Sequence, residues 1–454
     1  MLSLSIRAPI KTEAKEAMGL ALPLASAQVA QAATGFVDTV MMGWLGRDVL
    51  AAGGLAATTF TTLLVTATGI VIGISPLVAE AYGAGNRARI QQVSRQGLWL
   101  SLLVSLPIML LLANAEPLMG ALGQSPTVAA TARVYLGILV WGFFPALAFA
   151  MLKAVVSSLS QPRPVMVIVI GGTVFNAIAN YLLGFGPWGL PALGLRGLAI
   201  ASLVSQWVML ACLVTYVLTQ TSLKHYRLFH QWQRFEPTVL RELVWIGLPI
   251  GVSFGLEVGL FSVTTYLMGA LGTDLLAAHQ IVFQTIAVIF MVPLGLSMAT
   301  TIRVGQWNGR QDRQGVRRAT WVAIGLSATF MTLMATMLLL FPRQAIGLFI
   351  DVNDPVNGRV VALAASMFVI AALSQILDGV QTAAAGALRG LKDTRVPMML
   401  SFLAFWGVGL ASGYCMGFWL GLGGIGLWLG QATGVAFAAI LFTWRFCRLT
   451  QVRS

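Results

Sequence analysis

Long apolar runs separated by short polar connections dominate the hydropathy pattern of this chain. A helix needs about 20 apolar residues to cross the roughly 30 Å hydrocarbon layer of a bilayer. The chain offers twelve such runs, over residues 17–43, 50–80, 91–113, 128–152, 164–185, 194–219, 243–270, 275–302, 319–341, 360–388, 396–419 and 424–446. Each run is predicted to be a helix, because an apolar segment of this length cannot leave its backbone N–H and C=O groups unpaired in lipid.

The basic residues of the connections fall almost entirely on one side of the predicted membrane. Counting loop by loop places 23 of the 28 Lys and Arg residues on the side of the N-terminus. The others are Arg47, Arg133, Arg196, Arg343 and Arg359. Because cytoplasmic loops carry such an excess of positive charge, both termini are predicted to lie in the cytoplasm.

A polar segment near the middle of the chain separates the runs into two groups of six. We therefore predict an N-terminal lobe over residues 1–220, a cytoplasmic linker over 221–242 and a C-terminal lobe over 243–454. The segment MLSLSIRAPIKTEAKEAMG, which opens the chain, is predicted to be a short amphipathic or flexible lead-in to the first span.

The two groups of runs are related in sequence. The beginning of the first run aligns with the beginning of the seventh, which matches Pro23 with Pro249 and Asp48 with Asp274. Repeats with an even number of helices form parallel halves, and the transport site of such proteins lies between the halves. The prediction is an all-α polytopic membrane protein with 12 transmembrane helices in two pseudo-symmetric six-helix lobes.

Composition agrees with a protein that is solvated mainly by lipid. The mean hydropathy is +0.84 and only 9% of the residues are charged, against about 25% in ordinary soluble chains. The net charge of +13 does not indicate a nucleic-acid partner, because the basic residues lie in the short loops. The three cysteines have no CxxC spacing, which argues against a disulfide framework or a zinc site. We expect a monomer in the lipid bilayer.

Three acidic residues interrupt the apolar runs. Asp38, Glu257 and Asp378 lie within the first, seventh and tenth runs. A carboxylate at the bilayer centre costs at least about 2.5–3.5 kcal/mol on insertion scales. Burial favours the neutral form, so such a group can exchange a proton or bind a metal cation. We predict a proton or Na⁺ site at Glu257 and Asp378, or at Asp38, and the structural alternative is a carboxyl group held by interhelical hydrogen bonds.

The two predicted lobes carry their acids at different repeat positions. Asp38 aligns with Thr264, and Glu257 aligns with Gln31, so the two sites are predicted to have specialised. The sequence offers no obvious Lys or Arg partner within the runs near these acids. This favours a mobile cation as their counter-charge.

Two amides in the fifth run are candidates for the same chemistry. Asn176 and Asn180 stand four residues apart and therefore share one helical face. Such amides commonly form interhelical hydrogen bonds. The alternative is that they supply neutral oxygen ligands beside Asp38.

The eighth run contains candidates for a substrate cavity. Phe283, Gln284, Phe290 and Met291 are predicted to line it, because Met adapts its shape and aromatic faces attract cations. The alternative is ordinary packing, which is also the prediction for His279. No GxxxxGK[ST] motif and no zinc or nucleophile constellation occurs in the sequence. The chain is therefore predicted not to be an enzyme, to use no cofactor and to draw energy from a coupling ion, Na⁺ or H⁺.

Five motifs along the chain carry a family resemblance: GFVDTVMMGWLG, GLPIGVSFGLEVGLF, AAHQI, TIRVGQWNG and ALRGLKDTRVPM. Together they resemble the NorM-type branch of the multidrug and toxic compound extrusion (MATE) family over essentially the whole chain. The resemblance implies an antiporter of the bacterial inner membrane with two six-helix lobes. It would export lipophilic organic cations, such as drugs and dyes, in exchange for Na⁺ or H⁺.

The resemblance also assigns roles to the polar residues of the spans. It implies that Glu257 and Asp378 are the cation-site acids of the C-terminal lobe, and that Asp38, Asn176 and Asn180 form the polar cluster of the N-terminal lobe. Ser374 stands where close relatives often carry Tyr, one helical turn before Asp378, and this departure bears on the identity of the coupling ion. Asn180 stands where some relatives carry Asp, so the polar cluster of the N-terminal lobe holds one fewer titratable group.

The alternative function is a flippase for lipid-linked oligosaccharide, a member of the same wider superfamily. Such flippases tend to place basic residues in a central cavity, whereas this sequence places acids at mid-membrane.

Overall fold

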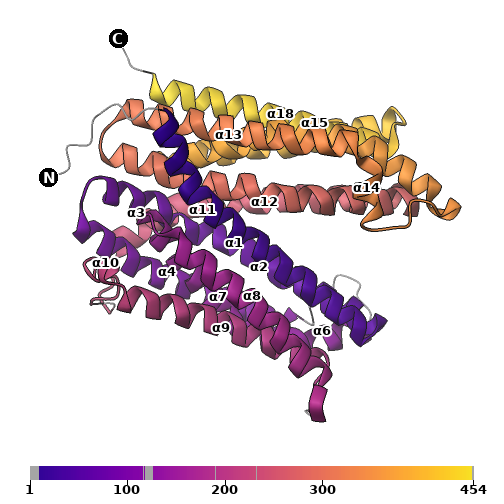
Figure 1. Cartoon of the computed structure of the whole chain (residues 1–454), viewed down its shortest axis with the longest axis horizontal. Coiled ribbons are helices and arrows are strands. Elements are labelled where there is room, and N and C mark those ends of the chain that lie inside the picture. The colour runs from indigo at the N-terminus through magenta and orange to yellow at the C-terminus, as the bar shows by residue number, and fades with distance from the viewer. Residues whose placement is uncertain (1–9, 116, 118–125, 190, 232, 452–454) are drawn as a thin grey trace. The chain divides into compact units, whose positions relative to one another are not determined.

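The computed structural model describes residues 10–115, 117, 126–189, 191–231 and 233–451. These residues form helices joined by short connections, with no strand in the described ranges. Twelve of the helices, some of them built from consecutive segments, are long and apolar enough to cross a membrane (Figure 1). The prediction of an all-α polytopic membrane protein with 12 spans is confirmed.

The first six spans begin with α1, the helix that opens the described chain. Their segments are α1 (Ile10–Leu45), α2 (Arg47–Ile72) with α3 (Ile74–Gly83), α4 (Arg87–Ala113), α6 (Pro126–Leu139) with η1 (Val140–Gly142) and α7 (Phe143–Ser158), α8 (Pro162–Phe185), and α9 (Leu195–Thr219). The short segments η2 (Pro187–Gly189) and α10 (Thr221–Lys224) lie in the connections.

The last six spans begin with α11 and end near the C-terminus. Their segments are α11 (Pro237–Leu271), α12 (Thr273–Gly309), α13 (Arg313–Leu340), η3 (Pro355–Asn357) with α15 (Gly358–Gly390), α16 (Arg395–Ser401) with η4 (Phe402–Leu410), α17 (Ala411–Tyr414) and η5 (Cys415–Trp419), and α18 (Gly423–Thr450). The short α14 (Pro342–Gly347) follows α13.

Helices α1 and α11 begin earlier than the hydropathy pattern predicts. The predicted lead-in is helical from Ile10 onward, and its first nine residues lie outside the described ranges. Likewise α11 begins at Pro237, inside the predicted linker. Both early turns carry acids that form ion pairs, Glu13 with Arg303 and Glu242 with Arg89. These pairs offset the low hydropathy of the two helix beginnings.

Packing divides the chain into two compact units. One consists of Ser26–Gly251 and is called the N-unit here; the other consists of Met1–Ala25 together with Val252–Ser454 and is called the C-unit. The boundaries lie within α1 and α11, two residues after the repeat-related Pro23 and Pro249. The lobe limits derived from chain order stay a prediction. Helix α1 begins in the C-unit and continues in the N-unit, whereas α11 begins in the N-unit and continues in the C-unit.

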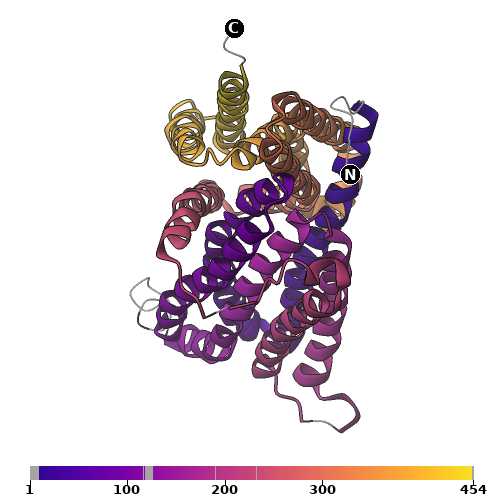
Figure 2. The ribbon, with the colours of Figure 1, turned by 90° about the vertical axis from the view of Figure 1, so that its left-hand side faces the viewer.

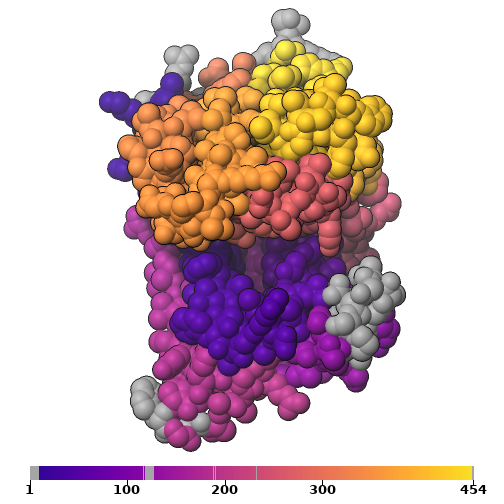
Figure 3. All heavy atoms as spheres, turned by 90° about the vertical axis from the view of Figure 1, so that its right-hand side faces the viewer, coloured from indigo at the N-terminus to yellow at the C-terminus, as the bar shows by residue number. Residues whose placement is uncertain are grey.

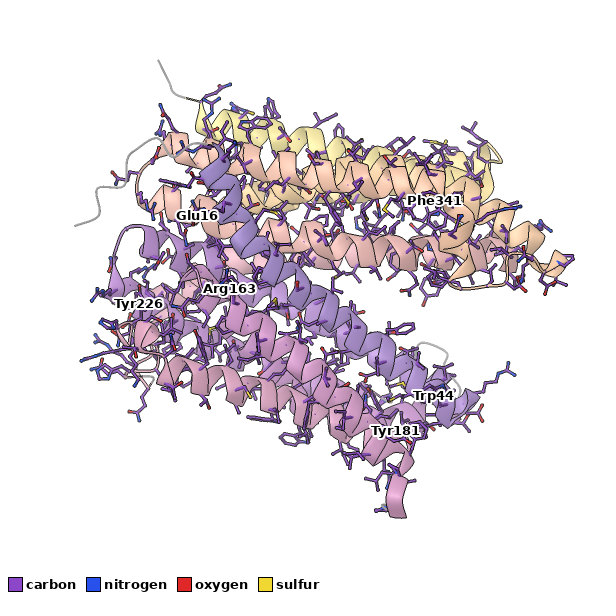
Figure 4. All side chains as sticks on the ribbon, in the orientation of Figure 1. Glu16, Trp44, Arg163, Tyr181, Tyr226 and Phe341 are labelled. Atoms are coloured by element: carbon purple, nitrogen blue, oxygen red, sulfur yellow. The ribbon has the colours of Figure 1, made fainter. Side chains whose placement is uncertain are left out.

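Within the N-unit, small residues allow close helix contacts at one point and aromatic rings pack at another. A Cβ atom on Gly73 would lie 2.5 Å from the Cα atom of Gly247, so the beginning of α11 can approach the α2–α3 junction only through glycine. Trp44 and Tyr181, both labelled in Figure 4, pack their rings against Phe185 at centroid distances of 6.0 and 5.9 Å.

In the C-unit, α15 packs against α12, α13 and α18, and α12 also packs against α13. Most of this unit is the orange-to-yellow part of the ribbon in Figure 2 and of the spheres in Figure 3. The eleventh span, from α16 to η5, contains π-helical turns and approaches α18 through glycines on both helices. These glycines repeat every four residues, at Gly409, Gly413 and Gly417 on one helix and at Gly426, Gly430 and Gly434 on the other. Such small-residue stripes let two membrane helices approach closely.

Candidate functional site

A ring of hydrogen bonds surrounds Asp38 inside the N-unit. Asn180 Nδ2 donates to Asp38 Oδ1 at 2.5 Å and to Asn176 Oδ1 at 3.0 Å. Asn176 Nδ2 donates to Ser202 Oγ at 3.2 Å, and Ser202 Oγ donates to Asp38 Oδ2 at 3.4 Å. The structure thus places both amides beside the acid, on the helical face that their spacing predicts. We call these four residues the Asp38 cluster.

Three helices contribute to the Asp38 cluster, and a fourth adds a tyrosine. Asp38 lies on α1, the two amides on α8 and Ser202 on α9. Tyr135 on α6 is buried within hydrogen-bonding reach of Ser202 and within electrostatic range of Asp38. Ser202 and Tyr135 were not predicted from the sequence, because the role of a single polar residue in an apolar run depends on which residues of other helices it contacts.

The Asp38 cluster offers oxygen atoms to a cation. Asn180 is fully buried, and its Oδ1 atom has no hydrogen-bond partner among the residues that the structure describes. Carboxylate, amide and hydroxyl oxygens are the ligands that hard cations prefer. The same carboxylate could instead accept a proton, so the role of the cluster as a cation site stays a prediction.

A second group of charges lies within the C-unit. Glu257 on α11 and Asp378 on α15 lie within electrostatic range of each other. Within the described ranges neither carboxylate makes a hydrogen bond or an ion pair, although both are only partly exposed. We call Glu257, Asp378 and the neighbouring Arg389 the Glu257 cluster. Its two acids keep their oxygen atoms available to a proton or a metal cation.

Arg389 corrects the expectation that no basic residue lies near these acids. It occupies the last turn of α15, and its positive charge acts on Glu257. Its own hydrogen bonds go to neutral groups, from Nη2 to Ser297 Oγ at 2.8 Å and from Nε to the Ala385 carbonyl at 3.2 Å. The tenth span extends two residues beyond its predicted end, which brings Arg389 into the helix instead of the adjoining loop.

Lys153 is a second basic residue that lies just outside a predicted span, the run over residues 128–152. It lies on α7, is 5% exposed, and turns toward α1. Its Nζ atom donates to the Oε1 atoms of Gln28 and Gln31, at 3.2 Å each. In the sequence, Lys153 directly follows the predicted fourth run, which ends at residue 152. The helix continues to Ser158, so Lys153 lies within it.

The four candidates for a substrate cavity all lie on α12. Phe283 packs against Phe261 and stacks on His279, with ring centroids 5.3 and 5.9 Å apart. Gln284 is exposed, whereas Phe290 and Met291 are partly exposed. No polar or ring contact in the described ranges ties these last three to the Glu257 cluster, so their role in binding stays a prediction.

His279 is a packed residue, as predicted. It is fully buried, its Nε2 atom lies 3.0 Å from Thr265 Oγ1, and its ring also packs against Trp428. In the described part of the chain, no group of three or more His, Cys, Asp or Glu residues is placed to hold a metal ion. A Na⁺ site would therefore have to combine one or two carboxylates with neutral oxygens.

Comparison with known protein families gives two matches along the chain. The model of the family described as MatE matches residues 23–182 and again residues 249–415. The matches begin at Pro23 and Pro249, which are the positions that the internal repeat aligns.

Curated relatives match nearly the whole chain. A protein of Synechocystis sp. named "Probable multidrug resistance protein NorM" is 50% identical over 98% of this chain and 97% of its own length. A protein of Burkholderia vietnamiensis named "Multidrug resistance protein NorM" is 39% identical over 94% of this chain and 92% of its own length.

Solved structures share the same fold at low sequence identity. A MATE transporter of Vibrio cholerae superimposes with a TM-score of 0.87 at 20% identity, over 97% of both chains. A eukaryotic MATE transporter gives a TM-score of 0.84 at 20% identity, over 97% of this chain and 98% of the other.

Proposed function

The chain belongs to the MatE family, and from this premise we propose that it is a secondary active multidrug efflux antiporter. It exports lipophilic organic cations in exchange for Na⁺ or H⁺. The named multidrug resistance relatives support drug efflux over the flippase alternative. The membership in a transporter family agrees with a role in transport rather than in catalysis.

The Glu257 cluster is the observation that carries this proposal. Two carboxyl groups within electrostatic range of each other, inside apolar spans, make no ion pair with any described residue. Charged groups in hydrocarbon are costly, and those that occur in spans commonly mark ion pathways and proton relays. Arg389 can balance only one of the two acids, so a mobile cation is the counter-charge that best explains the second.

Exchange follows from competition for the same negative charge. When Na⁺ or H⁺ binds at Glu257, Asp378 or Asp38, the carboxylate no longer attracts an organic cation. A drug bound by that charge is then released, and binding of the next drug displaces the ion. Because an ion or ligand shifts a conformational equilibrium only through its differential affinity for the two states, this competition must be coupled to alternating access.

The transporter is proposed to be a monomer in the bacterial inner membrane. Its proposed topology places both termini in the cytoplasm. The excess of basic residues on one side of the predicted spans supports this orientation. Reporter fusions at the C-terminus, active only in the cytoplasm, test it directly.

Efflux assays in proteoliposomes test the proposed mechanism. Glu257→Gln and Asp378→Asn remove charge with little change of shape, so each is expected to lower ethidium efflux at least about tenfold, which corresponds to roughly 1.4 kcal/mol. Imposing a Na⁺ gradient and a pH gradient separately on the wild type identifies the coupling ion.

A matched control is Glu16→Gln, which changes an acid whose side chain is 58% exposed. This variant is expected to transport like the wild type. Wild-type efflux by both Glu257→Gln and Asp378→Asn, with folding verified, would remove the proposed exchange mechanism. Counterflow of lipid-linked oligosaccharide without dye transport would favour the flippase instead.

A further inference from the structure

The two halves of the chain place a basic side chain against the same pair of repeat positions. In the N-unit, Lys153 from the fourth span donates to Gln28 and Gln31 of the first span. In the C-unit, the fourth span of the second half contributes Arg389. The repeat aligns Gln28 with Phe254 and Gln31 with Glu257.

Arg389 faces these two aligned positions in the C-unit. Its guanidinium lies over the ring of Phe254, 5.7 Å from the centroid. Its charge also acts on Glu257, and the charge of Glu257 acts on Arg389 in return. The repeat-related positions Gln31 on α1 and Glu257 on α11 therefore each face a positive charge.

The charges at the two positions sum differently. In the Glu257 cluster, two acids and one arginine leave a single negative charge unbalanced when all three are ionised. One proton or one Na⁺ balances it. In the N-unit, Lys153 meets two neutral amides, and within the described ranges it forms no ion pair.

A second cation next to Lys153 would be strongly disfavoured. Two like charges a few ångströms apart repel strongly where the effective dielectric constant is far below that of water. The lysine is buried, so bulk solvent screens this repulsion only weakly. Two amide oxygens already bind its ammonium group, as ligands would bind a free cation.

We propose that the basic residue of the fourth span sets how many mobile cations each of these repeat-related positions holds. The Gln28–Gln31 position holds none, because Lys153 acts as a tethered cation there. The Glu257 position holds one, because Arg389 balances one of its two acids. This inference deepens the proposed function and rests on cation binding at Glu257.

Introducing an acid at Gln31 tests the inference, since it copies Glu257 into the N-unit. Gln31→Glu is made in three backgrounds: the wild type, Lys153→Arg, which keeps the positive charge, and Lys153→Met, which removes it. The full-length variants are purified in lipid nanodiscs. Radioactive Na⁺ retained at saturation is counted per molecule, together with protons released when a lightly buffered solution is made mildly alkaline.

The expected result is a gain of one Na⁺ or H⁺ per molecule from Gln31→Glu in the Lys153→Met background only. With the wild-type lysine or with Lys153→Arg, the new carboxylate is balanced internally and the count stays unchanged. An equal gain in all three backgrounds, or no gain in any of them, overturns the proposal.

A second arm covers the case in which Lys153→Met fails to fold. Arg389→Gln leaves both acids of the Glu257 cluster unbalanced, so this variant must hold one cation more than the wild type. An unchanged count in that arm overturns the proposal as well.

Failure of the proposed function gives a separate result. Glu257→Gln must lower the count by one in every background. If it does not, cation binding at Glu257 is wrong, whatever Gln31→Glu shows.

Discussion

At the scale of single residues, one buried acid holds the beginning of α1 within the C-unit. Arg303 on α12 donates to both carboxylate oxygens of Glu13, at 2.8 Å each. Trp307 Nε1 donates to the same carboxylate at 3.1 Å. The side chain of Glu13 is fully buried, whereas that of Glu16 is 58% exposed and lies 3.4 Å from Arg303.

This geometry predicts unequal effects for two neighbouring acids. Glu13→Gln removes the buried carboxylate that accepts two hydrogen bonds from Arg303 and leaves only the more distant Glu16 as its charged partner. The free energy of unfolding is therefore expected to fall by about 3–5 kcal/mol. Glu16→Gln is expected to change it by at most about 1 kcal/mol, because the Glu16 side chain is exposed to solvent and lies 3.4 Å from Arg303. Denaturation of the purified variants in detergent measures both values, and losses of similar size would contradict the assignment.

The acids of the candidate site could be located from sequence, but their partners could not. Asp38, Glu257 and Asp378 are recognisable because an acid in an apolar run is rare and costly. The spacing of Asn176 and Asn180 also predicts their shared face. Ser202, Tyr135, Lys153 and Arg389 gain their meaning from contacts between helices that are distant in sequence, and periodicity within one helix carries no information on such contacts.

At the scale of elements, hydropathy locates every span but not its ends. The apolar run predicts where lipid surrounds a helix, and helices such as α1, α11 and α12 continue beyond it through polar turns held by ion pairs and packing. The π-helical turns of the eleventh span were also not predicted. They occur where that span packs against the glycine stripe of α18.

The glycine stripe gives a prediction at this scale. A Cβ atom on Gly430 would collide with the backbone of Gly413, whereas a Cβ atom on Gly325 of α13 would meet nothing within 4 Å. Gly430→Ala is therefore expected to destabilise the protein by about 1–3 kcal/mol through overpacking. Gly325→Ala should be neutral, or stabilising by up to about 1 kcal/mol, because alanine loses less entropy in a helix. Thermal unfolding compares the pair, and equal melting temperatures would contradict a close contact at Gly430.

At the scale of the whole molecule, the repeat in the sequence predicted two related groups of six spans. It did not predict that α1 and α11 each change unit near Pro23 and Pro249. The alignment compares one half with the other, so it shows which residues correspond but not which half each helix beginning packs against. The ion pairs of Glu13 and Glu242 are among the contacts that hold these helix beginnings in place.

Because α1 and α11 each contribute residues to both units, the structure predicts how the chain behaves when it is cut between α10 and α11. The second fragment then lacks Ile10–Ala25, and with it the Glu13 partner of Arg303, so neither fragment can complete its unit alone. Each fragment expressed singly is expected to be degraded, whereas the two expressed together should purify as one complex with ethidium efflux. Adding Glu13→Gln to the first fragment should lower the yield of the complex, and Glu16→Gln serves as the matched control. A second fragment that accumulates alone in a folded, protease-resistant form would contradict this prediction, because the C-unit would then be complete without the beginning of α1.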